Sequence, residues 1–255
     1  MSSGALAFAR FAWPPNVLGY CGPAGTALFE ALATESVEAA AGAARRFEGA
    51  WPYLEVIAAS AGIDDPLDRR VVEAYWIGNE LLRRVDPARL GTDLDERFRR
   101  RSGPGWERVA STIGEGAVAH HAFHVFVVYP WTGMLRAGPA EPALEVLERC
   151  SIRAGTVATV DGDRALVSVQ SLAWDGVRFD EGDAVDGWYK LGAEGIRTTE
   201  PRVGERVAVH WDWVCDRLDR VRERRLAGWT AHARRLAERG LQGIPFTAAA
   251  QTVRP

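Results

Sequence analysis

The chain has 255 residues, of which 47% are hydrophobic and 25% are charged. This length suffices for one large domain or two small ones, and the composition is that of a globular protein. A net charge of −3 excludes a general electrostatic attraction to nucleic acid. The three cysteines are odd in number and far apart, so we expect no disulfide framework and a cytoplasmic location.

The first 22 residues are predicted to form an extended arm. Pro14 and Pro15, together with several glycines, interrupt an aromatic-rich segment and disfavour a regular helix. Cys21 lies in the sequence Gly-Tyr-Cys-Gly-Pro. It is either a reactive or metal-binding thiol or a small buried residue in a turn, and we favour the turn residue.

Residues 24–148 show no alternation typical of strands and are predicted to be helical. Helices are expected over residues 24–34, 36–47, 51–61, 65–84, 94–101, 116–128 and 142–149. The segment 116–135 has no charged residue and approaches the length of a membrane span. Its three histidines and Pro130 suit lipid poorly, so we predict a buried helix and no membrane span.

From Cys150 the periodicity changes to that of β-strands. The Val-Asp-Gly-Asp sequence at 160–163 predicts a tight hairpin turn, because Asp-Gly accepts positive φ angles. Apolar residues alternate with more polar ones over 165–170, as expected for the returning strand. Residues 175–201 are predicted to be loops and short strands, and a strand over 207–209 ends at His210.

After Asp212 the spacing becomes helical again, and an arginine-rich amphipathic helix is predicted to end before Gly240. The fold class that we expect is therefore α+β. An all-α domain covers residues 1–148, a small β-barrel with a C-terminal helix covers 149–240, and a loose tail covers 241–255.

Cys150 and His210 lie at the two ends of this predicted barrel and form the first candidate site. A thiolate and a neutral imidazole are good ligands for iron or zinc, and two protein ligands leave positions open for a cargo. Arg149 and Arg153 are expected to lower the pKa of the thiol, and Asp212 is expected to orient the imidazole. Alternatively, Cys150 is a small buried residue and His210 a hydrogen-bonded histidine of the barrel.

Three separate elements follow one another here in a recognisable order, namely Cys150–Val157, Val160–Val167 and Val203–His210. A Cys before a glycine-containing strand, a Val-Asp-Gly-Asp turn before a Val/Ala strand, and a Val-Gly turn before a strand ending in His resemble the HypC/HupF family of hydrogenase assembly chaperones. The resemblance extends over residues 149–239, and its last part is a helix.

This resemblance implies an OB-like, HypC-like barrel and a function in the maturation of nickel–iron hydrogenase. It implies an accessory protein rather than an enzyme. Cys150 and His210 would carry iron, as an iron–cyano–carbonyl fragment. The partner would be the hydrogenase large subunit or a maturation protein.

His120, His121 and His124 form a second candidate site. On a helix, His120 and His124 lie one turn apart on the same face, whereas His121 points elsewhere. This spacing suits two ligands of one metal or a haem contact. A third ligand would come from Glu73, Glu80 or Glu115. The alternative function is therefore a metal- or haem-dependent enzyme, although the absence of a His-Glu-x-x-His pattern does not favour a zinc hydrolase. Buried, hydrogen-bonded histidines are the simpler interpretation.

Overall fold

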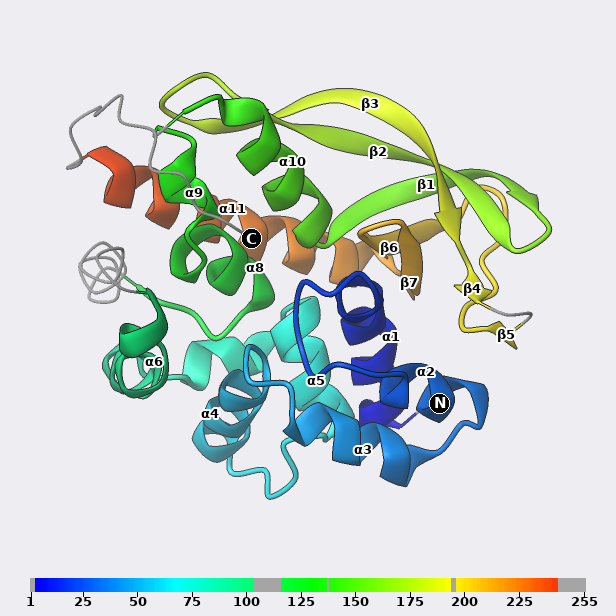
Figure 1. The fold of residues 1–255 in the computed structure, drawn as a ribbon, viewed down its shortest axis with the longest axis horizontal. Coiled ribbons are helices and arrows are strands. Elements are labelled where there is room, and N and C mark those ends of the chain that lie inside the picture. The colour runs from blue at the N-terminus through cyan, green and yellow to red at the C-terminus, as the bar shows by residue number, and fades with distance from the viewer. Residues whose placement is uncertain (1–2, 103–115, 137, 194–195, 243–255) are drawn as a thin grey trace.

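The computed structural model describes residues 3–102, 116–136, 138–193 and 196–242 (Figure 1). Its first part is helical, as the sequence predicts. The helices are α1 (Gly4–Val17), α2 (Ala27–Ala33), α3 (Val37–Arg45), α4 (Trp51–Ala61), α5 (Arg69–Trp76), the 3₁₀-helix η1 (Glu80–Arg84), α6 (Pro87–Ser102), α8 (His121–Phe123), the π-helix η3 (His124–Val128), α9 (Trp131–Met134) and α10 (Ala140–Cys150).

A closed barrel and a long helix follow, so the predicted order of helices, barrel and C-terminal helix is confirmed. The barrel has five strands in the order β1-β2-β3-β7-β6, and β4 and β5 form a separate two-stranded sheet. The elements are β1 (Arg153–Asp161), β2 (Arg164–Trp174), β3 (Phe179–Lys190), β4 (Gly192–Ala193), β5 (Ile196–Arg197), β6 (Arg206–His210), β7 (Trp213–Leu218) and α11 (Arg220–Gln242). The tail from 243 onward lies outside the described residues.

The N-terminal segment is the helix α1, so the predicted extended arm is wrong. The Ser3 side chain caps α1 by accepting a hydrogen bond from the Leu6 amide at 3.2 Å. Pro14 and Pro15 lie in its last turn, where each removes only one helical hydrogen bond. Three aromatic side chains are buried on α1, and each contributes about 1.5–3 kcal/mol, which outweighs this loss. They are Phe8, Phe11 and Trp13.

The helix predicted over residues 65–84 is interrupted between α5 and η1. Gly78 lies there with a φ of +96°, which L side chains rarely adopt. A Cβ atom at Gly78 would lie 2.1 Å from Cδ1 of Trp229 in α11. The interruption therefore lets α11 pack directly on the helical part.

Two strands lie where the sequence predicts other structure. β3 is one long strand within the stretch 175–201, where loops and short strands are expected and where β4 and β5 are indeed short. β7 replaces the beginning of the predicted C-terminal helix. β7 pairs with β6, and its Trp213 pairs with Lys190 of β3, which closes the barrel. Both faces of β7 are buried over its first three residues, because Val214 points into the barrel core while Cys215 belongs to the larger core outside it. This double burial hides the alternation typical of a strand.

The hairpin predicted at Val-Asp-Gly-Asp is confirmed. Asp161 pairs with Arg164, and Gly162 between them has a φ of +54°. The interior of the barrel is a small core made mainly of valines, and its members include Val157, Val167, Val169, Val207, Val209 and Val214.

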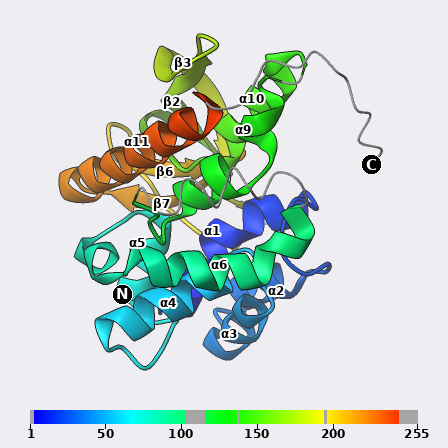
Figure 2. The ribbon, with the colours of Figure 1, turned by 90° about the vertical axis from the view of Figure 1, so that its left-hand side faces the viewer.

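The helical part and the outer face of the barrel share one larger core, to which Phe8, Ile57, Leu147, Ala208 and Trp213 all belong. Figure 1 shows α1–α5 on one side of α11 and strands β1–β3 on the other, and Figure 2 shows α11 next to α10 at the same junction. The two predicted domains are thus joined by a continuous apolar interface.

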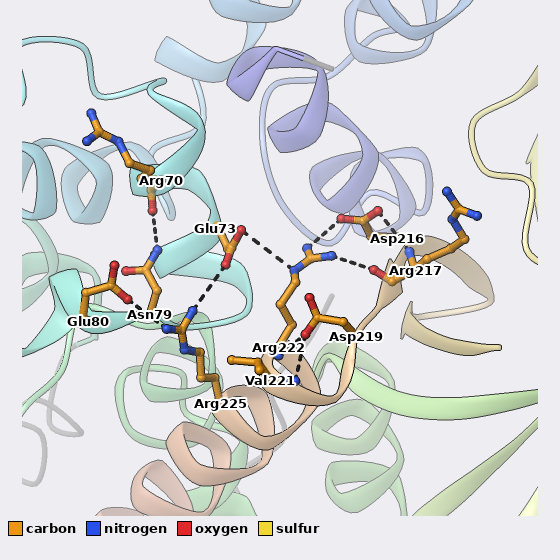
Figure 3. A network of polar contacts seen from close by, with 10 residues as sticks. All are labelled: Arg70, Glu73, Asn79, Glu80, Asp216, Arg217, Asp219, Val221, Arg222 and Arg225. Atoms are coloured by element: carbon orange, nitrogen blue, oxygen red, sulfur yellow. Dashed lines mark hydrogen bonds and ion pairs between the residues drawn. The ribbon is translucent and has the colours of Figure 1, made fainter. Parts of the chain in front are cut away.

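Arginines of α11 hold α5 and β7 in place at this interface (Figure 3). Arg222 lies 3.9 Å from Glu73 of α5 and 2.7 Å from Asp216 of β7. Arg225 lies 3.9 Å from Glu73 and 3.0 Å from Glu80. Glu73 and Glu80, which the sequence offers as third ligands for the histidine pair, are therefore engaged by arginines instead.

The uncharged segment 116–135 forms the short pieces α8, η3 and α9 rather than a helix over 116–128. Most of its side chains are buried. None of the helices within the described ranges combines the length and apolar character needed to cross a membrane.

Candidate metal site

Cys150 and His210 lie together at the junction of the helical part and the barrel. Cys150 is the last residue of α10, and His210 is the last residue of β6. His121, the first residue of α8, joins them. One ligand atom from each of the three residues lies within 4.8 Å of the other two, and all three side chains are buried. The structure thus brings together the pair that the sequence predicts and adds a third residue.

The orientation of His210 is fixed by the N-terminal helix. Its Nδ1 atom lies 2.8 Å from the Phe11 carbonyl oxygen. That carbonyl is available because its helical partner four residues later is Pro15, which has no N–H. A carbonyl only accepts hydrogen bonds, so Nδ1 carries the proton and Nε2 presents a lone pair. A backbone carbonyl that fixes the tautomer in this way is typical of metal-binding histidines.

The Nε2 atom of His210 is buried and makes no hydrogen bond of good geometry to any residue in the described ranges. Burial lowers the pKa of His210 to about 3, with the charge of His121 as a further cause and the nearby carbonyls of Phe11 and Cys150 opposing the shift. At neutral pH this imidazole is therefore uncharged and ready to bind a cation.

His121 is engaged on both ring nitrogens. Nε2 lies 2.9 Å from the Cys150 carbonyl oxygen, and Nδ1 lies 3.4 Å from the Tyr75 hydroxyl. The carbonyl is one of those that the end of α10 leaves without a helical partner. Burial lowers the pKa of His121 to about 4. To bind a metal, the ring must give up one of these contacts, at a cost of about 1 kcal/mol.

The Cys150 thiol is protonated at neutral pH. Burial raises its pKa to about 12. The expectation that Arg149 and Arg153 lower this pKa is wrong, because both are paired with carboxylates. Arg149 lies 2.7 Å from Asp212, and Arg153 lies 2.9 Å from Glu148. A divalent cation would have to displace the thiol proton.

Asp212 does not orient His210, contrary to the prediction, since the Phe11 carbonyl does so. Asp212 instead binds Arg149, whose guanidinium lies 5.0 Å from the centre of the Trp211 ring. Trp211 has a φ of +53°, a strained conformation for a bulky residue, and its amide donates to the Arg149 carbonyl at 2.8 Å. The Arg149–Asp212 pair thus packs against the Trp211 ring next to His210.

The predicted pairing of His120 with His124 on one helix face is wrong, because the helix begins only after His120. His120 is the N-cap of α8, with extended backbone angles of −125° and 145°, and its Nδ1 accepts a hydrogen bond from the Ala122 amide at 3.1 Å. His124 begins the π-helix, and its Nδ1 lies 2.9 Å from the Tyr53 hydroxyl. Glu115, a suggested third ligand, lies outside the described residues.

The residue that sequence reasoning missed is His121. The cluster of three histidines within five residues is a valid signal, but the predicted helix face includes His120, which lies before the first residue of the helix. Because α8 begins only at His121, that side chain points toward the barrel rather than away from it.

A cavity of about 180 Å³ reaches the three residues. Aromatic and histidine side chains make up much of its wall, including Tyr75, Trp76, His124, Tyr129 and Trp131. Among the described residues around the cavity, none is Asp, Glu, Lys or Arg. The cavity therefore offers a metal nitrogen and sulfur ligands in an apolar environment.

A helical part, a closed five-stranded barrel and a buried His-Cys-His group between them define a protein with a candidate metal site. The chain belongs to a family of unknown function (DUF6390), whose model matches residues 1–243. The match covers the helices and the barrel together, so both parts are features of the family. Neither the comparison with curated proteins nor that with solved structures gave a match.

Proposed function

We propose that the protein is an accessory protein of nickel–iron hydrogenase maturation that holds an iron fragment through Cys150, His210 and His121. The observation that carries the proposal is the convergence of Cys150 and His210, the two residues to which the HypC/HupF resemblance gives this role. They come from opposite ends of the barrel segment. The resemblance further suggests docking to the hydrogenase large subunit or to a maturation protein.

The chemistry of the three side chains supports a carrier. Thiolate and imidazole suit iron and zinc, and three protein ligands leave positions open, whereas structural sites are closed by four. The adjoining cavity of about 180 Å³ has room for small ligands of the metal. It is smaller than the roughly 300–1,000 Å³ typical of pockets for drug-sized molecules, which does not favour haem.

The helical part has a defined place in this proposal. It supplies His121 as a ligand and the Phe11 carbonyl that orients His210. An enzyme centred on His120 and His124 is not proposed, because these two residues do not share a helix face and Glu73 and Glu80 are bound to arginines.

The test is anaerobic purification of the full chain from cells that produce the nickel–iron hydrogenase maturation proteins. Iron per chain is measured together with the infrared bands of metal-bound cyanide and carbon monoxide. We expect wild type to retain iron and both bands and Cys150→Ala to lose them. Cys215→Ala is the matched control, because Cys215 is also buried but does not line the cavity.

Folding of each variant is checked by circular dichroism, so that a loss of iron is not confused with a loss of structure. The proposal is contradicted if folded Cys150→Ala retains as much iron as wild type, or if wild type carries none.

A further inference from the structure

A second thiol, that of Cys21, lines the same cavity. Cys21 is only partly exposed, and both burial and the nearby charge of Cys150 raise its pKa above the ordinary value. The thiols of Cys21 and Cys150 therefore face one common cavity. Cys21 is not among the three residues whose ligand atoms lie within 4.8 Å of one another, so its sulfur lies farther than this from at least one of them.

The segment between α1 and α2, residues 18–26, is folded so that it carries Cys21 over the cavity. The Asn16 side chain donates to the carbonyl oxygens of Cys21 at 3.0 Å and Pro23 at 2.8 Å. Gly22 has a φ of +84°, and a Cβ atom there would lie 2.1 Å from Cε2 of Phe47. Only glycine lets the chain pass this close to the cavity wall.

The same segment covers the candidate metal site from outside. Tyr20 lines the cavity, and its ring lies 4.1 Å, centre to centre, from that of Trp211, the residue after His210. Tyr20 is 51% exposed and also lines the cavity, so this part of the cavity wall borders solvent. A displacement of this segment would change the distance between the Cys21 sulfur and the three ligands.

Charge balance favours the binding of a divalent ion by the Cys21 thiolate. A divalent ion held by two neutral imidazoles and one thiolate keeps a net positive charge, and a buried charge without a partner is unfavourable. No Asp or Glu is found among the described residues that line the cavity. Apart from tyrosines, Cys21 is the remaining side chain there that can provide a negative charge. The buried Nε2 lone pair of His210, which faces the same cavity, independently marks it as a place for a ligand.

We propose that Cys21 supplies a second thiolate to the divalent metal bound by His121, Cys150 and His210, and so closes the site with two sulfur and two nitrogen ligands. This inference rests on the three-residue metal site of the proposed function and concerns a divalent ion that carries no cyanide or carbonyl ligands. Binding breaks the two S–H bonds, forms two metal–sulfur bonds and releases two protons to solvent, with no change of oxidation state. Withdrawal of residues 18–26 would reopen the fourth position for a partner's ligand.

The first test is a titration of the reduced full chain with Co²⁺, whose sulfur-to-cobalt charge-transfer absorption grows with the number of bound thiolates. We expect Cys21→Ser to reduce this absorption to about half, the double variant Cys21→Ser/Cys150→Ser to abolish it, and Cys215→Ser to leave it unchanged. Equal absorption of Cys21→Ser and wild type overturns the inference but leaves the proposed function standing. Absence of the band from wild type overturns both.

The second test uses wild type alone, so it does not depend on the folding of a variant. Alkylation of each cysteine by iodoacetamide is followed by mass spectrometry with and without Zn²⁺. We expect Zn²⁺ to slow the alkylation of Cys21 and Cys150 by about tenfold or more, because alkylation needs a free thiolate. Protection of Cys150 without protection of Cys21 overturns the inference.

Discussion

Lowering the pH from about 7 to about 5 is expected to unfold the protein, because four of its histidines are buried. Burial lowers the pKa of His120, His124 and His210 to about 3 and that of His121 to about 4. The same side chains in the unfolded chain bind protons near pH 6.5. Between pH 6.5 and about 4 the unfolded state therefore holds more protons, and the free energy of unfolding decreases as the pH falls.

The expected effect is large. At pH 5 each of the four histidines lowers the free energy of unfolding by about 2 kcal/mol, or roughly 8 kcal/mol together. The total for an ordinary domain is about 5–15 kcal/mol. The carboxylates of Asp68, Asp175 and Asp219 have pKa values below their ordinary range, so they titrate at lower pH and do not produce this loss.

Urea unfolding between about pH 7.5 and 5 measures this dependence. Replacement of His124 by Gln removes one titrating group and should reduce the slope near pH 5 by about 1.4 kcal/mol per pH unit, and by less at higher pH. A free energy of unfolding that is constant over this range would show that the histidines are not buried in a neutral form.

Zinc is expected to stabilise the metal-free protein strongly against heat. At a free concentration of about 1,000 times the dissociation constant, a ligand that binds only the folded state contributes about 4.1 kcal/mol. For a chain of this size that corresponds to a rise in the midpoint of unfolding of roughly 8–16 °C. The rise follows from the burial of the three ligands between two parts of the chain, since unfolding must disperse them.

His121→Ala and His210→Ala should each abolish most of this rise in calorimetry. His120→Ala is the control: it also removes a buried histidine and lowers the starting stability, but it should preserve the rise on adding zinc. An equal zinc effect in His121→Ala and wild type would exclude His121 from the ligands.

Local sequence signals predicted the part of the fold that depends on turns and strand alternation. Asp161-Gly162 predicts the hairpin, and the change of periodicity at Cys150 predicts the start of the barrel. Local sequence signals do not predict the secondary structure of segments whose conformation depends on tertiary packing. The prolines of α1 are tolerated because its aromatic residues are buried, and β7 has no alternation because both of its faces are covered.

Sequence patterns likewise predict part of the candidate site, namely two of its three residues. Cys150 and His210 were found because each lies at the end of a recognisable element. His121 could not be separated from His120 and His124, since the choice depends on the residue at which α8 begins. The contact between His210 and Phe11 joins residues 199 positions apart, and no local pattern encodes it.

The most direct test of the His121–Cys150–His210 site is X-ray absorption spectroscopy of the zinc-loaded full chain. We expect sulfur at about 2.3 Å and at least two imidazole nitrogens at about 2.0–2.1 Å from the metal, with one imidazole fewer in His121→Ala. A first shell of oxygen and nitrogen atoms without sulfur, or a spectrum unchanged in His121→Ala, would contradict the site.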